Sequence, residues 1–189
     1  MTTIDNSKYI PQIGDIILKD SDKTGARIVK FLMQSPTVWH QIYRYFTKTL
    51  EYIPYYHVQM VYLNGEVIEQ QTKVKTREIN LNSVQIIFRH KYLSYDKITD
   101  LLIRADKDIG QGYDILNCIG KALTWITGLK FFARYIQWPR AEICVNRIAY
   151  WYWKELGEHF GAKTHSELTT QSMLKYLSVN PNYEVVYLK

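Results

Sequence analysis

A β-hairpin signal over residues 55–70 constrains the fold of this chain more than any other segment. Two runs rich in β-branched and aromatic residues, 55–63 and 66–70, flank the dipeptide Asn64-Gly65. An Asn-Gly dipeptide between two such runs is the strongest short-range indication of a hairpin. Two antiparallel strands are therefore expected here, and their register decides which polar side chains share a face.

The length of the hairpin loop decides whether His57 and Glu69 can meet. Side chains alternate between the two faces of a strand, so a two-residue Asn64-Gly65 turn would pair Met60 with Glu69 and direct Glu69 away from His57. A three-residue loop at residues 63–65 would instead place Gly at the left-handed position of a type I turn with a bulge. A site that joins His57 to Glu69 therefore predicts the three-residue loop.

The same loop predicts two further pairings across the hairpin. Gln59 would pair with Glu69, which leaves Glu69 diagonal to His57 on one face. Gln71 would lie directly opposite His57. We therefore take Glu69 as the expected partner of His57 and Gln71 as the reserve.

The remaining pattern mixes strands and helices and predicts an α+β fold. Hydrophobic residues make up 47% of the 189 residues and aromatic residues 14%, which is too rich in core formers for a disordered chain. This length fits a single domain, 1–189, with a helical insert at about 19–55. Further strands are expected at 13–18, 84–88 and 183–188, and helices at 24–50, 94–109, 114–127, 140–156 and from Thr169 or Thr170 to about 177.

Charge and cysteine content exclude several classes of function. The net charge is +6, but Lys and Arg are scattered among acidic residues and the densest basic stretch, Lys73 to Arg77, is short, so no nucleic-acid surface is expected. The two cysteines, Cys118 and Cys144, form no close Cys/His cluster, and we expect neither a metal nor another cofactor.

The start of the chain lacks the layout of a signal peptide. Met-Thr-Thr-Ile-Asp-Asn-Ser-Lys is polar rather than basic and then apolar, and no apolar run approaches the length that spans a membrane. The expected location is therefore the cytoplasm, where both thiols stay reduced.

Cys144 is the candidate nucleophile of this chain. Trp138-Pro139 precedes the helix expected at 140–156, so Cys144 lies in its first turns, where the helix dipole lowers the pKa of a thiol. Cys118 is the rival, but it lies in the middle of an expected helix, where a buried inert thiol is the simpler interpretation.

A nucleophilic thiol needs a base, and that base needs a group that orients it. Of the five histidines, His57 alone lies in a β-pattern flanked by apolar residues. A histidine at the start of a strand is more often structural than catalytic, so both roles stay open from these residues alone. The catalytic interpretation requires that Cys144, His57 and Glu69 converge in space.

Several motifs in a fixed order resemble the circularly permuted papain-like hydrolases of the NlpC superfamily, particularly the YiiX/YebB-type branch, with the LRAT-like acyltransferases as more distant relatives. The resemblance spans nearly the whole chain, and no single motif carries it. The motifs are Gly14-Asp15-Ile16-Ile17, the segment from His57 to Glu69, Gly112-Tyr113-Asp114, Cys144, the segment from Leu168 to Leu174 and the strand from Tyr183 to Tyr187.

The resemblance implies a permuted papain-like fold, with a small antiparallel sheet or half-barrel packed against helices that include the one bearing Cys144. It implies Cys144 as nucleophile, His57 as general base and Glu69 as the group that orients His57. The backbone N–H of Cys144 is the natural oxyanion donor at an open helix start. The implied activity is that of a cysteine amidase or peptidase, which hydrolyses an amide or ester through an acyl-cysteine intermediate.

The implied substrates are a peptide, a peptidoglycan (cell-wall) fragment, or an N-acylated, lipid-like small molecule. A competing hypothesis is a papain-like scaffold with little or no turnover that binds a partner, because the expected insert at about 19–55 could close the site or recruit that partner. A third and weaker hypothesis is a peripheral membrane enzyme, suggested by the basic and aromatic segment at residues 129–136.

Overall fold

The computed structural model describes residues 9–19, 57–71, 73–112, 123, 127, 144–165 and 168–188. The predicted insert at about 19–55 therefore lies almost wholly outside the described residues, as do Tyr113, Asp114, Cys118 and the segment 129–136. The helix predicted at 24–50 is also outside. Of the helix predicted at 114–127, only residues 123 and 127 are described, and both are helical.

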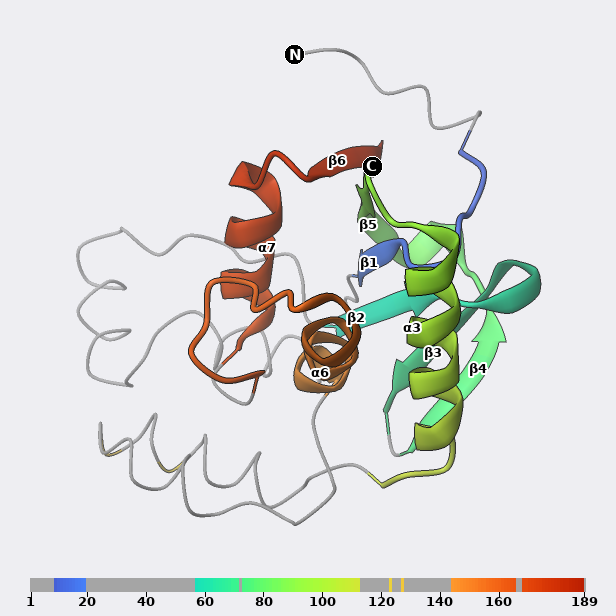
Figure 1. Cartoon of the computed structure of the whole chain (residues 1–189), viewed down its shortest axis with the longest axis horizontal. Coiled ribbons are helices and arrows are strands. Elements are labelled where there is room, and N and C mark those ends of the chain that lie inside the picture. The colour runs from blue at the N-terminus through green and yellow to red at the C-terminus, as the bar shows by residue number, and fades with distance from the viewer. Residues whose placement is uncertain are drawn as a thin grey trace.

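A six-stranded antiparallel sheet forms the centre of the described structure (Figure 1), with the strand order β4-β3-β2-β1-β5-β6. Together with the helices it confirms the predicted α+β class. The strands are β1 (Ile16–Lys19), β2 (His57–Val61), β3 (Glu66–Gln70), β4 (Val74–Glu78), β5 (Val84–His90) and β6 (Tyr183–Leu188).

Three described helices, α3 (Tyr95–Asp108), α6 (Cys144–Leu156) and α7 (Thr170–Val179), pack on one face of this sheet. In Figure 1, α6 is seen nearly end-on in the middle, with α3 and α7 on either side of it. The larger apolar core lies between these helices and the sheet, and a smaller cluster that includes Ile17, Val67 and Tyr187 covers the other face. Among the described residues, no helix is long and apolar enough to cross a membrane.

The hairpin of β2 and β3 has the register that the three-residue loop predicts. Residues Leu63–Gly65 form a short 3₁₀ turn, with a positive φ of 54° at Asn64 and of 75° at Gly65. Asn and Gly are the residues that adopt this left-handed conformation at least cost. Gln59 consequently pairs with Glu69, which confirms the predicted register.

The ends of the helices also follow local sequence signals. Ser94 accepts a hydrogen bond from the backbone N–H of Lys97 and caps α3. Thr169, rather than Thr170, caps α7 in a reciprocal arrangement with Ser172. Both caps satisfy N–H groups that the first turn of a helix leaves without a partner.

Two strands differ from the predictions. β1 begins at Ile16 rather than Ile13, because residues 13–14 form a turn in which Gly14 has a φ of 86°. A Cβ at Gly14 would lie only 2.8 Å from the Leu93 side chain, so glycine is required there. β4 was not predicted at all, because its sequence Val-Lys-Thr-Arg-Glu has one apolar residue and lacks the alternation of a half-buried strand.

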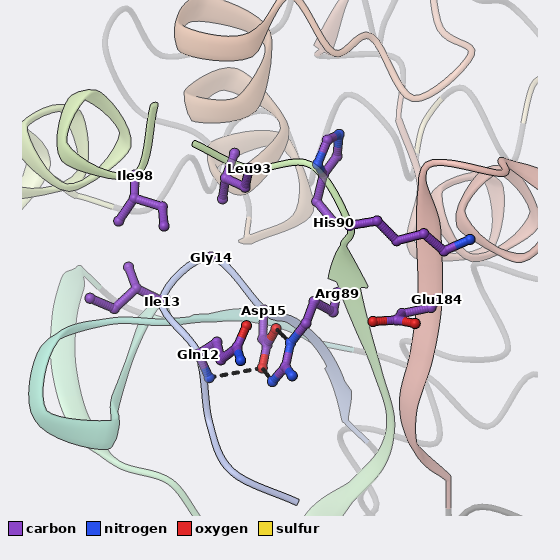
Figure 2. Close-up of a pocket in the computed structure, with 10 residues that line it drawn as sticks. Gln12, Ile13, Gly14, Asp15, Arg89, His90, Leu93, Ile98 and Glu184 are labelled. Carbon is purple, nitrogen blue, oxygen red and sulfur yellow. Dashed lines mark hydrogen bonds and ion pairs between the residues drawn. The ribbon is translucent and has the colours of Figure 1, made fainter. Parts of the chain in front are cut away.

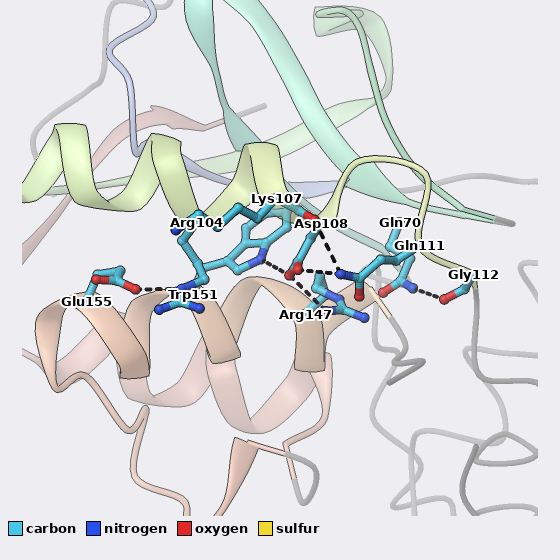
Figure 3. A network of polar contacts seen from close by, with 9 residues as sticks. All are labelled: Gln70, Arg104, Lys107, Asp108, Gln111, Gly112, Arg147, Trp151 and Glu155. Carbon is cyan, nitrogen blue, oxygen red and sulfur yellow. Dashed lines mark hydrogen bonds and ion pairs between the residues drawn. The ribbon is translucent and has the colours of Figure 1, made fainter. Parts of the chain in front are cut away.

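A buried polar network fixes α6 against the end of α3 (Figure 3). One carboxylate oxygen of Asp108 accepts hydrogen bonds from Arg147 at 2.8 Å and from Trp151 at 2.7 Å, and the other oxygen accepts one from Gln111 at 2.7 Å. Arg147 and Trp151 lie one and two turns after the first residue of α6. The network therefore sets the rotation of this helix about its axis, and with it the direction of the side chain of Cys144.

Candidate functional site

The three candidate residues come from three different elements and meet in the interior. Cys144 is the first described residue of α6, His57 lies at the start of β2, and Glu69 lies in β3. Cys144 and His57 are each only 5% exposed, and Glu69 is fully buried. The Cys144 thiol is not part of a disulfide.

His57 contacts Glu69 on one side and Cys144 on the other. Its Nε2 lies 2.7 Å from Oε2 of Glu69. The His57 side chain also forms a hydrogen bond with the Cys144 side chain. Because Nε2 is engaged by the carboxylate, Nδ1 is the ring nitrogen that remains for the thiol. A thiol, an imidazole and a carboxylate thus contact one another in that order, as a nucleophile, a base and an orienting group would.

The residue that bonds to His57 is Glu69, the expected partner, and not the reserve Gln71. Gln71 follows the last residue of β3 and is exposed, and its backbone N–H bonds to the carbonyl of Lys73. Glu69 is brought to His57 by the hairpin register, which places the two on the same face.

Burial and neighbouring charges have opposite effects on the pKa of His57. Burial alone would lower the pKa of His57, but the charges and hydrogen bonds of Cys144 and Glu69 outweigh it and raise that pKa to about 9. Burial would raise the pKa of the Glu69 carboxyl, yet His57, Gln59 and Arg77 hold it below its ordinary value. The imidazolium form of His57 is therefore favoured at neutral pH.

The pKa of the Cys144 thiol is shifted downwards. Burial alone would raise its pKa, but the charge and hydrogen bond of His57, followed by backbone N–H donors of Val58 and Val145, lower it. A thiolate beside an imidazolium is the reactive form of a nucleophilic cysteine.

The pH range of this ion pair can be measured. The imidazolium of His57 is lost as the pH rises through about 9, and the thiolate of Cys144 is lost as the pH falls through its lowered pKa. We expect the absorbance at 240 nm to show a Cys144 thiolate at pH 6.5, where only about 1% of an ordinary thiol is ionised. The signal is the difference between the wild type and Cys144→Ala. Appearance of this thiolate only near pH 8.5–9 would contradict the ion pair.

Two residues of the site were missed by the sequence analysis. Gln59 donates a hydrogen bond from its side-chain amide to Oε2 of Glu69, and Nε of Arg77 lies 3.0 Å from Oε1 of Glu69. The predicted pairing of Gln59 with Glu69 was the signal that could have identified the first. Arg77 gave no such signal, because its strand was not predicted.

The cavity drawn in Figure 2 is separate from this site. It has a volume of about 510 Å³ and is lined by the turn before β1, the end of β5 and Glu184. It lies at the start of β1, whereas His57 pairs with Lys19 at the end of that strand. Its central ion pair, between Arg89 and both oxygens of Asp15 at 2.8 Å, is satisfied internally.

Within the described part of the chain, no three or more His, Cys, Asp or Glu residues are grouped so that they could hold a metal ion. The side chains of Cys144, His57 and Glu69 are of the types that serve as nucleophile, base and orienting group in thiol hydrolases.

Comparison with known proteins supports the fold. No family model and no curated protein matches the chain. The structure resembles the crystal structure of the metalloprotein YiiX from Escherichia coli O157:H7, with a TM-score of 0.58 and 16% sequence identity. The match covers 96% of this chain and 99% of that chain. The chain thus has a YiiX-like fold, and at this identity the likeness extends to the fold alone.

Proposed function

We propose that this chain is a cysteine hydrolase with the permuted papain-like fold of the NlpC superfamily. Cys144 is the nucleophile, His57 the general base and Glu69 the group that orients His57. One observation carries the proposal: a buried thiol and a buried carboxylate contact the same imidazole, and the Nε2 of that imidazole lies 2.7 Å from Glu69. A cysteine buried only for packing has no need of such a partner.

The reaction begins with attack of the Cys144 thiolate on the carbonyl carbon of an amide or ester. The new C–S bond moves the carbonyl electron pair to oxygen, and the backbone N–H of Cys144 stabilises this oxyanion. As the oxyanion collapses, His57 gives its proton to the leaving nitrogen or oxygen, and that bond breaks to leave a thioester. His57 then takes a proton from water, which attacks the thioester and releases the acid and the thiolate.

Glu69 acts on His57 rather than on the substrate. Its hydrogen bond at Nε2 directs Nδ1 towards Cys144 and stabilises the imidazolium that alternately gives and takes the proton. The substrate class comes from the resemblance of the sequence motifs. It is a peptide, a peptidoglycan fragment, or a small molecule that carries an N-acyl or lipid-like amide.

The test is to locate the acyl group after reaction with a small activated ester. We expect p-nitrophenyl acetate to release p-nitrophenolate in a burst and to add one acetyl group to the folded protein, located on Cys144 by peptide mass mapping. Hydroxylamine should remove this group, as it does from a thioester. Cys118→Ser should be acetylated normally. An acetyl group found only on Cys118 or on lysines would contradict the proposal.

A second candidate is a papain-like scaffold that binds a partner without turnover. The observation that favours it is the 5% exposure of both Cys144 and His57, which leaves little of the thiol open to a substrate. The two candidates give different results in one pair of measurements. A closed site would show the Cys144 thiolate in the absorbance titration but no acetylation, whereas an accessible hydrolase would show both.

A further inference from the structure

The Glu69 carboxylate is held at both of its oxygens, by side chains from the strands on either side. Oε2 lies 2.7 Å from Nε2 of His57 and accepts a hydrogen bond from the side-chain amide of Gln59. Both of these residues belong to β2. Oε1 lies 3.0 Å from Nε of Arg77, which belongs to the edge strand β4. Glu69 itself is fully buried. Each oxygen therefore has its own partner strand.

The contact between Arg77 and Oε1 is an ion pair rather than an aligned hydrogen bond. Neither Oε1 of Glu69 nor Nε of Arg77 has a hydrogen-bond partner among the described residues. Arg77 is therefore the charge that compensates Oε1, which would otherwise be a buried carboxylate oxygen with no counterpart. The Arg77 side chain is 34% exposed, so it reaches inward from the surface of the sheet.

The register of β3 and β4 shows that the contact is selective. Lys75 pairs directly with Glu69, and Arg77 pairs with Val67, which places Arg77 diagonal to Glu69 on the same face. The nearer cation by register, Lys75, forms no ion pair with Glu69 in the described structure, whereas Arg77 does. Lys75 thus provides the same charge on the same strand without the contact.

We propose that Arg77 is a positioning residue of this site. By holding Oε1, it fixes the plane of the Glu69 carboxylate so that Oε2 stays on Nε2 of His57. The proposal rests on the function proposed above, and it adds a residue that touches neither the thiol nor the imidazole.

Removal of Arg77 distinguishes positioning of Glu69 from a direct effect of the Arg77 charge, because the two change the pKa of His57 in opposite directions. A cation near His57 disfavours the imidazolium, so loss of the charge alone would raise the pKa of His57 or leave it unchanged. Loss of the positioning contact would free Glu69 to turn away and would lower that pKa. The other groups that face the pair are Cys144 from α6, Gln59 from β2 and, in register with His57, Lys19 from β1. All of them stay in place in the test.

The experiment is an NMR titration of the His57 imidazole, assigned by the loss of its signal in His57→Gln. In Arg77→Gln we expect the pKa of His57 to fall by about one pH unit or more from its value of about 9. Acetylation of Cys144 at pH 8.5 should slow in parallel. Lys75→Gln is the matched control and should leave the pKa of His57 unchanged or slightly raised.

Arg77→Lys keeps the charge at a position from which it can still reach Oε1, and it should restore part of the lost shift. If Arg77→Gln does not fold, Arg77→Met is the test variant, because it keeps most of the aliphatic packing of the side chain and cannot hold Oε1. A pKa of His57 in Arg77→Met equal to that of Lys75→Gln would then overturn the proposal. An unchanged or raised pKa in folded Arg77→Gln would overturn it directly.

These outcomes are distinct from failure of the proposed function. A wild-type protein without a raised pKa of His57 and without acetylation of Cys144 would remove the hydrolase proposal itself. If the wild type shows the raised pKa of His57 and acetylation of Cys144, and Arg77→Gln shows the same pKa, only the proposed role of Arg77 is wrong.

Discussion

Replacement of His57 by glutamine is expected to slow the acetylation of Cys144 by about 10²–10⁴-fold at pH 7, the usual contribution of a positioned acid or base. Glutamine retains a polar group that can still bond to Glu69, but it carries no positive charge and cannot exchange a proton. The Cys144 thiol then loses the charge and hydrogen bond that oppose its burial, and its pKa rises. The measurement is the burst rate of p-nitrophenolate release.

The pH dependence distinguishes this effect from damage to the fold. In His57→Gln the rate should rise about tenfold for each pH unit below the new thiol pKa, because the thiolate is then supplied by pH rather than by the imidazolium. His159→Gln is the matched control, since His159 is an exposed residue that packs against Trp153. It should react like the wild type. Acetylation of His57→Gln at the wild-type rate would exclude His57 as the base.

Replacement of Asp108 by alanine is expected to lower the free energy of unfolding by about 3–5 kcal/mol, the usual cost of removing one partner of a buried ion pair. Asp108 is the acceptor for Arg147 at 2.8 Å and for Trp151 at 2.7 Å, and both donors are buried. The change leaves the Arg147 cation in the interior without its carboxylate. Urea denaturation followed by circular dichroism measures the loss.

Two further variants identify the cause of this loss. Asp100→Ala removes an exposed carboxylate from the same helix and should change the stability by no more than about 0.5 kcal/mol. Asp108→Leu combined with Arg147→Met removes both charges, and it should be less destabilised than Asp108→Ala, because no buried charge is left alone. A double variant that is as unstable as the single one would show that packing, and not the ion pair, carries the effect.

The stability of the Asp108 network also matters for the candidate site. Arg147 follows Cys144 by one turn of α6. A change that makes this turn less rigid therefore also makes the position of the Cys144 side chain less fixed. The same variants therefore link the packing of the helix to the ionisation of Cys144.

The parts of the structure that were predicted from the sequence depend on a few neighbouring residues. Asn64 and Gly65 tolerate positive φ, which predicts a tight loop at this point but fits a two-residue as well as a three-residue loop. The structure has the three-residue loop, the one that the catalytic interpretation required, and Gln59 pairs with Glu69. Ser94 and Thr169 cap their helices through bonds to N–H groups three residues on.

The parts that were not predicted depend on residues that are distant in sequence or carry a misleading signal. β4 was read as a short basic stretch, because an edge strand presents charged side chains and has little apolar pattern. The role of Arg77 could not be inferred without that strand. The bonds from Arg147 and Trp151 to Asp108 join two helices whose relative placement no local pattern encodes.

The sequence by itself determined that residues 55–70 form a hairpin closed by a tight loop at Asn64-Gly65, because these two residues adopt positive φ at least cost. The folded structure decided that the loop has three residues, and with it the register that brings His57 and Glu69 onto one face. Only the tertiary structure decided that the Cys144 thiol meets the other side of His57 and that Arg77 meets Glu69. The position of α6 depends on the burial of its apolar face and on its buried polar bonds to α3. Such contacts between distant segments form only when the whole core packs together.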